Sequence, residues 1–299
     1  MRIRIGLPAV AIALLLVADV VLLTQQDQST AVSLDAAVQG FRSAQSSETT
    51  VATTAPADPA APAAATTAVP GTRGAAAPEA KTGTASAPAA AATSGPFRVP
   101  AEGVYSYRTT GSEEVSLGGG RHQYPERTYA AVRAKGGCDW DFEHRVLEEH
   151  VERRVQCSAP GQLTQKDERA EITFFGQANK ADYRCDPPLV ISRAGDGAGA
   201  KYTGACRSSE GQFTMTTTFI GRERLTVGGV AVDAVHVLME SVTSGQGDGT
   251  SRNDYWLHAD TGLMLKSVRK VQTRAKAYGS TVDYREDSSF ELERLEPAR

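Results

Sequence analysis

The residues best suited to chemistry in this 299-residue chain are four cysteines and two nearby histidines. The cysteines are Cys138, Cys157, Cys185 and Cys206, and the histidines bound the segment His144-Arg-Val-Leu-Glu-Glu-His150. An even number of cysteines without a C-x2-C pair favours two disulfides over a four-cysteine zinc site. Three pairings are open. We expect the sequential one, Cys138 with Cys157 and Cys185 with Cys206, because each pair then flanks a turn.

Sequence motifs of enzymes are absent. The His144–His150 segment is neither H-E-x-x-H nor H-x-x-E-H, and the chain has no nucleophile elbow, phosphate loop or dinucleotide fingerprint. We therefore predict that the protein is not an enzyme and has no catalytic residue, cofactor or metal. His236 and Trp256 are the candidate pocket residues, although a satisfied core or edge histidine is the simpler interpretation. A hydrolase is the weaker alternative, and it requires His236 or His144 to meet a carboxylate and a serine in a cleft.

The first cysteine pair predicts an antiparallel hairpin. Folding residues 138–157 about their midpoint places Trp140 opposite Val155. One face then carries most of the apolar side chains and the other carries most of the charged ones, which is typical of a half-buried pair of strands. This register places His144 and His150 on opposite faces of the hairpin, with His150 among the solvent-facing charges.

The remaining sequence after residue 96 also predicts strands. Apolar and polar residues alternate, and Gly228-Gly229 and Asp260-Thr261-Gly262 are typical of tight hairpin turns. No long segment there shows helical periodicity. We predict an extracytoplasmic all-β domain over residues 97–299, an antiparallel curved sheet in the form of a half-barrel, barrel or sandwich.

The N-terminus predicts the location of the protein. An apolar run over residues 5–24 follows Arg2 and Arg4. Twenty helical residues span about 30 Å, the thickness of the hydrocarbon layer, and the preceding positive charges favour a cytoplasmic N-terminus. We predict a single-pass transmembrane signal anchor over residues 1–24, with the cell membrane as its partner through residues 5–24. The alternative is a signal peptide that is cleaved to release a secreted protein.

Two segments separate this run from the all-β domain. Residues 25–44 form a juxtamembrane segment in which apolar residues recur at helical spacing after Ser33, a candidate N-cap. They predict a short amphipathic helix, or a helix that frays in solution. Residues 45–96 are nearly all Ala, Thr, Pro, Ser and Gly, so we predict a disordered linker with a typical span of about 40 Å, which would act as a spacer.

A resemblance is carried by three motifs near the C-terminus: Gly229-Val230-Ala231-Val232, Asp254-Tyr255-Trp256-Leu257 and Asp260-Thr261-Gly262-Leu263-Met264-Leu265. They resemble uncharacterised actinobacterial membrane-anchored exported proteins and, more distantly, the curved β-sheets of periplasmic lipoprotein carriers. The similarity covers about residues 210–296. In the carriers the sheet encloses an apolar groove for acyl chains, so the resemblance implies a lipidic ligand.

These observations predict a membrane-tethered binding or interaction domain of the cell envelope, with an apolar or lipidic ligand or an envelope protein as partner. The formal net charge of −3, with interspersed signs, gives no reason to expect nucleic acid. The alternative is a structural envelope protein that engages the cell wall or a membrane partner without a ligand pocket. An apolar concavity would favour ligand binding, and a filled core with an exposed apolar patch would favour a protein interface.

Overall fold

The computed structural model describes residues 30–52, 97–116, 120–174, 177–209, 211–245, 247–277 and 280–299. The predicted membrane segment and most of the predicted linker lie outside these ranges. Within them, no helix combines the length and the apolar character needed to cross a membrane. The described elements are α2 (Leu34–Ala52) and the strands β1 (Gly103–Val115), β2 (Gly120–Gln123), β3 (Arg127–Gly136), β4 (Asp139–Leu147), β5 (His150–Ala159), β6 (Gln162–Phe174), β7 (Gln177–Arg193), β8 (Lys201–Arg207), β9 (Gly211–Val227), β10 (Val230–Gly245), β11 (Gly247–His258), β12 (Met264–Ala277) and β13 (Ser280–Leu292).

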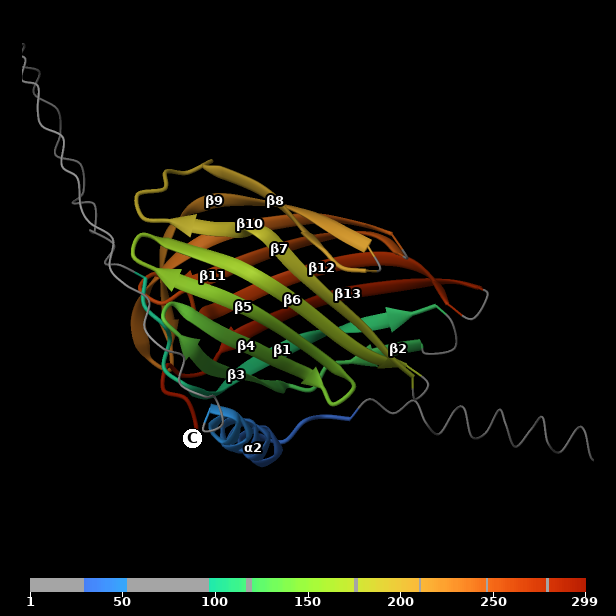
Figure 1. Ribbon diagram of the computed structural model, residues 1–299, viewed down its shortest axis with the longest axis horizontal. Coiled ribbons are helices and arrows are strands. Elements are labelled where there is room, and N and C mark those ends of the chain that lie inside the picture. The colour runs from blue at the N-terminus through green and yellow to red at the C-terminus, as the bar shows by residue number, and fades with distance from the viewer. Residues whose placement is uncertain are drawn as a thin grey trace, which may run out of the picture. The chain divides into compact units, whose positions relative to one another are not determined.

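The strands form one antiparallel sheet that closes on itself (Figure 1). From β3 to β13 each strand pairs with the next, and β1 pairs with both β3 and β13. Twelve strands therefore form the closed barrel, while β2 is a short partner of the end of β1. Because the sheet closes, the last strand β13 has a hydrogen-bonded neighbour on each side and leaves no free sheet edge. The predicted all-β class is confirmed, and the barrel is the form that the sheet takes.

The two predicted tight turns are present because their glycines adopt the required backbone. Gly228 and Gly229 have φ of 57° and 83° and form the two-residue loop between β9 and β10. Such a loop needs positive φ at both positions, which glycine adopts without strain. Gly262, with φ of 77°, ends the turn between β11 and β12.

The hairpin of β4 and β5 differs from the predicted register by one residue, so the prediction was wrong. Trp140 pairs with Gln156, not Val155, and a bulge between Arg145 and Leu147 moves the turn onward along the chain. A slip of one residue sends every side chain of a strand to the opposite face. The polar series His150, Glu152, Arg154 and Gln156 therefore faces the barrel interior. His144 and His150, predicted on opposite faces, are both buried there.

Both predicted disulfides are confirmed, and the second closes the weakest seam of the barrel. Cys138 bonds Cys157, and Cys185 bonds Cys206. Strands β7 and β8 share only two described residue pairs, and the second disulfide links one of them. The next residues of β7 include two prolines, which have no N–H to donate to a neighbouring strand.

Helix α2 begins at an N-cap and packs on the outside of the barrel. The hydroxyl of Ser33 accepts a hydrogen bond from the backbone N–H of Ala36 at 3.2 Å, which satisfies one free donor of the first turn. The apolar face of the helix packs on β1 and β3. The contact consists of Val32, Ala37 and Phe41 on Val104, Tyr129 and Ala131. The helix continues to Ala52, past the predicted start of the linker.

Candidate functional site

The barrel interior contains a cavity too small for a lipid. Its wall combines aromatic and aliphatic side chains, including Trp140, Phe142, Tyr255 and Met264, with the polar side chains of Arg154, Gln156 and Gln165. The cavity measures about 20 Å³. About 10 to 15 Å³ holds one water molecule, whereas sites for drug-sized ligands measure roughly 300 to 1,000 Å³. This cavity therefore has room for about one water molecule, and the buried apolar side chains of the barrel form one packed cluster.

Beside this cavity lies a group of buried charges, which we call the inner ionic cluster. It comprises Glu113, His150, Glu152, Arg154, Arg269 and Glu286, contributed by β1, β5, β12 and β13. The side chains of its six members are at most 15% exposed. Charges removed from water to this degree must be paired to be tolerated. The pairing inside the cluster therefore decides whether the barrel can hold it.

Two bridging groups connect the three acids. Arg269 donates to both carboxylate oxygens of Glu152, at 2.5 and 3.0 Å, and approaches Glu286 at 3.4 Å. His150 Nδ1 lies 2.8 Å from Glu113 Oε2, and its Nε2 lies 3.6 Å from Glu152 Oε1. A guanidinium that binds a carboxylate through two nitrogens is a strong, oriented pair. The cluster is thus one continuous network from β1 to β13.

The network keeps His150 charged. Burial opposes the charge, but the hydrogen bonds and negative charges of Glu113 and Glu152 outweigh it and raise the pKa of His150 to about 10. Burial likewise opposes the charge on Glu152, yet Arg269 and His150 hold its pKa well below the usual range. With His150 protonated, three carboxylates face one imidazolium and two guanidiniums. The buried charges then balance.

Two tyrosines add hydrogen bonds to the Glu113 oxygen that also bonds His150. Tyr124 and Tyr284 donate to Glu113 Oε2 at 3.0 and 3.1 Å. Burial raises the pKa of both phenols, so they remain protonated donors. A carboxylate that accepts several hydrogen bonds is stabilised in its charged form. Glu113 is therefore an ionised acceptor rather than a general acid, and its environment favours a structural role for the cluster.

The two candidate pocket residues lie together on the outer face of the barrel. His236 and Trp256 stack with ring centroids 4.1 Å apart, and neither is among the residues that line the described cavity. His236 lies between two carboxylates: Nδ1 is 2.9 Å from Glu223 and Nε2 is 2.9 Å from Asp254. Lys266 lies on Trp256 with its Nζ 5.4 Å from a ring centroid. The Trp256 ring therefore contacts both His236 and Lys266.

Neither histidine meets the condition that we set for a hydrolase. Both ring nitrogens of His236 are occupied by carboxylates, so neither can activate a hydroxyl. His144 Nε2 bonds the hydroxyl of Thr128 at 2.9 Å, and burial lowers the pKa of His144 to about 3. A general base needs access to its substrate, and this imidazole is fully enclosed. The described residues thus contain no serine-histidine-carboxylate arrangement in a cleft around either histidine.

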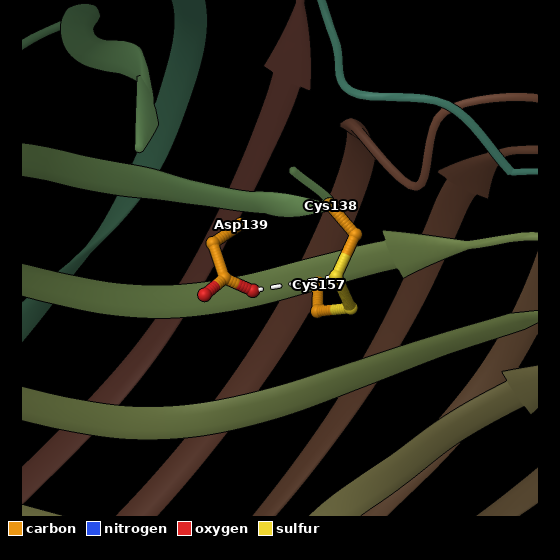
Figure 2. A group of neighbouring side chains, drawn as sticks. All are labelled: Cys138, Asp139 and Cys157. Atoms are coloured by element: carbon orange, nitrogen blue, oxygen red, sulfur yellow. Dashed lines mark hydrogen bonds between the residues drawn. A yellow bond between two sulfur atoms is a disulfide. The ribbon is translucent and has the colours of Figure 1, made fainter. Parts of the chain in front are cut away.

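One group of side chains has the spacing of a metal site but not its chemistry. Cys138, Asp139 and Cys157 place candidate ligand atoms within 4.8 Å of one another (Figure 2). The two sulfurs are bonded to each other, so no thiolate remains to bind zinc. The Asp139 carboxylate pairs with Lys166, whose Nζ lies 2.6 Å from it. The geometry is that of a disulfide beside a salt bridge.

Comparison with known proteins identified no family. No family model matches the chain, and no curated protein matches its sequence. Among solved structures, it is similar to the hypothetical lipoprotein YmcC of Escherichia coli K12, at 12% identity and a TM-score of 0.27 over 60% of this chain and 85% of that one. A candidate lipoprotein from Parabacteroides distasonis gives 9% identity and a TM-score of 0.31 over 66% of this chain and 97% of that one. Neither protein is described with a ligand or an activity.

Proposed function

We propose that this chain is a membrane-tethered, extracytoplasmic interaction domain of the cell envelope, which engages a protein or cell-wall partner through the outer surface of its barrel. The observation that carries the proposal is the small size of the described interior cavity, about 20 Å³. The two disulfides support an oxidising compartment, because such bonds persist outside the cytoplasm. The apolar run over residues 5–24 supports the tether.

The inner ionic cluster adds to the argument against a lipid in the interior. An acyl chain in contact with Glu152 and Arg269 would have to separate charges that are paired at 2.5 to 3.0 Å. Breaking a buried pair leaves an uncompensated charge at a cost of about 3 to 5 kcal/mol. The barrel interior therefore favours its own side chains over an apolar guest.

The outer surface has features that a partner can contact. Ile220, Val230 and Val242 are the large apolar side chains exposed among the described residues, at 40, 53 and 60%. All three lie on the neighbouring strands β9 and β10. They are separated along these strands and do not form the contiguous patch that would predict an obligate interface. We therefore expect a partner that binds through scattered apolar contacts within a polar surface.

Site-specific photo-crosslinking in intact cells tests this proposal. A photoreactive amino acid at Val242 is expected to give a discrete protein or cell-wall adduct, because this side chain is exposed and points away from the barrel interior. The matched control is Lys201, an exposed position on β8, which should give a different or weaker adduct if binding is local to β9 and β10. Absence of any envelope adduct at Ile220, Val230 and Val242 would contradict the proposal.

A second candidate function is lipid binding after the seam between β7 and β8 opens. The two-pair ladder at this seam is the observation that favours it, since Ile191 of β7 lines the cavity. An apolar ligand would enter there and enlarge the cavity. Trapping of a lipid by the purified protein, and its loss when the seam is locked by an additional cross-link, would support this candidate over the first.

A further inference from the structure

The segment before α2 and the first turns of the helix are attached to the barrel at three separate places. The backbone carbonyl of Thr30 accepts a hydrogen bond from the N–H of Glu148 at 2.9 Å, and the N–H of Thr30 lies 3.1 Å from the Glu149 carboxylate. The apolar face of the helix packs on β1 and β3. Farther along, the Arg42 guanidinium donates to the carbonyl oxygen of Arg299 at 2.7 Å.

Phe41 is the centre of this attachment. Its side chain is 4% exposed and packs in the cluster with Val104 and Tyr129. The Arg133 guanidinium lies 5.6 Å from the ring centroid, in the arrangement of a cation–π contact. In proteins most of the stability of a helix comes from the packing of its apolar face rather than from helix propensity, so the contact with the barrel stabilises α2. The contacts therefore bind the juxtamembrane segment to the folded domain.

We propose that residues 30–43 are a docking strap that holds the barrel directly to the N-terminal anchor, and that the low-complexity interval is not the tether. Residues 44–96 then connect two points on the same folded unit, since residues 30–43 pack on the barrel and Phe97 lies in its core. On this proposal, residues 44–96 do not set the distance between the anchor and the barrel.

The strap sets the distance of the barrel from the membrane and its orientation toward the membrane. This consequence rests on the proposed membrane anchor. Six peptide steps separate Thr24, the end of the apolar run, from Thr30, and a fully extended chain covers about 20 Å in that number. A spacer of 50 residues would instead allow about 40 Å. Because Thr30 bonds Glu148 and Glu149, the turn between β4 and β5 lies at the end of the barrel nearest the membrane.

Cleavage of the interval between the strap and the barrel tests the proposal. The full chain would carry an N-terminal tag and a specific protease site within residues 60–90, and would be cut in membranes from cells that express it. If the strap holds the barrel, the barrel fragment co-isolates with the tagged N-terminal fragment after cleavage. If the interval is the tether, cleavage separates the two fragments, which would overturn the proposal.

Two variants with the same new charge show whether the Phe41 contact holds the barrel fragment to the N-terminal fragment. Phe41→Asp places the carboxylate in the buried contact, whereas Gln39→Asp places it on the exposed side of the same helix. After cleavage we expect loss of the barrel fragment from Phe41→Asp and retention in Gln39→Asp. Equal retention in both would overturn the proposal. Uncut Phe41→Asp protein should keep both disulfides and its β-sheet circular dichroism, which excludes a failure to fold.

The same samples separate this inference from the proposed membrane anchor. Co-isolation of the two fragments is measured through the tag, in detergent, and does not depend on a membrane. The membrane fraction is measured separately before detergent is added. Co-isolated fragments found in the soluble fraction would contradict the anchor and support the strap, whereas a membrane-bound tag without the barrel would support the anchor and contradict the strap.

Discussion

The buried positive charge on His150 predicts that the free energy of unfolding falls at alkaline pH, because Glu113 and Glu152 stabilise that charge only while His150 is protonated. The ordinary pKa of histidine is 6.5, and in the folded protein Glu113 and Glu152 raise that of His150 to about 10. A group whose pKa is raised by folding stabilises the fold fully below its unfolded pKa, and this stabilisation disappears as the pH rises through the folded value. The window for loss therefore runs from about pH 6.5 to about pH 10.

The size of the effect follows from linkage. Each tenfold change in proton affinity corresponds to 1.36 kcal/mol, so the charged form of His150 contributes about 4 kcal/mol at pH 7 and about 1 kcal/mol at pH 9.5. The perturbation is His150→Gln, which keeps a hydrogen-bonding side chain but cannot be protonated. The free energy of unfolding should differ between wild type and variant by about 3 kcal/mol more at pH 7 than at pH 9.5.

Urea denaturation of the purified, disulfide-bonded protein at a series of pH values measures this difference. The control is His236→Gln, which changes a histidine that also lies between two carboxylates but on the outer face of the barrel. We expect His236→Gln to lose free energy of unfolding between pH 7 and pH 9.5 as the wild type does. A wild-type-to-His150→Gln difference that stays constant from pH 7 to pH 9.5 would refute the assignment of a buried imidazolium.

Two further predictions concern the closure of the barrel. Replacing the Cys185–Cys206 bridge with two serines should speed hydrogen exchange across β7 and β8, whereas the same change at Cys138–Cys157 should expose less backbone, because β4 and β5 share a longer ladder. Similar exchange in both variants would contradict the weak seam. Gly111→Ala should lower the free energy of unfolding by about 2 to 4 kcal/mol, since its Cβ would lie 2.2 Å from the Asp287 carbonyl oxygen at a φ of +115°. Gly136→Ala, with φ +96° and nothing within 4 Å, measures the backbone strain alone.

The sequence was sufficient for the fold class and the disulfides. Alternation with period two and glycines at the turns are local signals, and Gly228-Gly229 and Gly262 lie where those signals indicate. The cysteine pairing followed from the position of each pair about a turn. These features depend on residues near one another in the chain, which is why they could be predicted.

The inner ionic cluster could not be predicted, because it depends on the direction of one strand face. The bulge beside Val146 shifts the β4–β5 register by one residue and turns His150 and Glu152 inward. The usual rule assigns charged side chains to the solvent face, and only partners distant in sequence, such as Arg269, make their burial tolerable. The one local signal was the alternation His-x-Glu-x-Arg-x-Gln in β5, which is equally typical of a solvent face.

The docking of α2 could not be predicted from the sequence either, because it depends on residues distant in the chain. Its apolar spacing and the N-cap at Ser33 are visible in the sequence, but the surface that receives Phe41 is assembled from β1 and β3. A helical pattern alone does not separate a docked helix from one that frays. The proposed strap depends on this distinction, because a docked helix holds the barrel near the N-terminal anchor and a frayed helix does not.

Native mass spectrometry of the full chain, purified from the envelope in mild detergent and followed by lipid extraction, tests the central claim that the barrel interior is occupied by its own side chains. We predict the mass of the protein with both disulfides and no bound lipid, because the cavity of about 20 Å³ excludes an acyl chain. A lipid that remains bound at one copy per protein through detergent exchange would contradict the account and favour a carrier that opens at the β7–β8 seam.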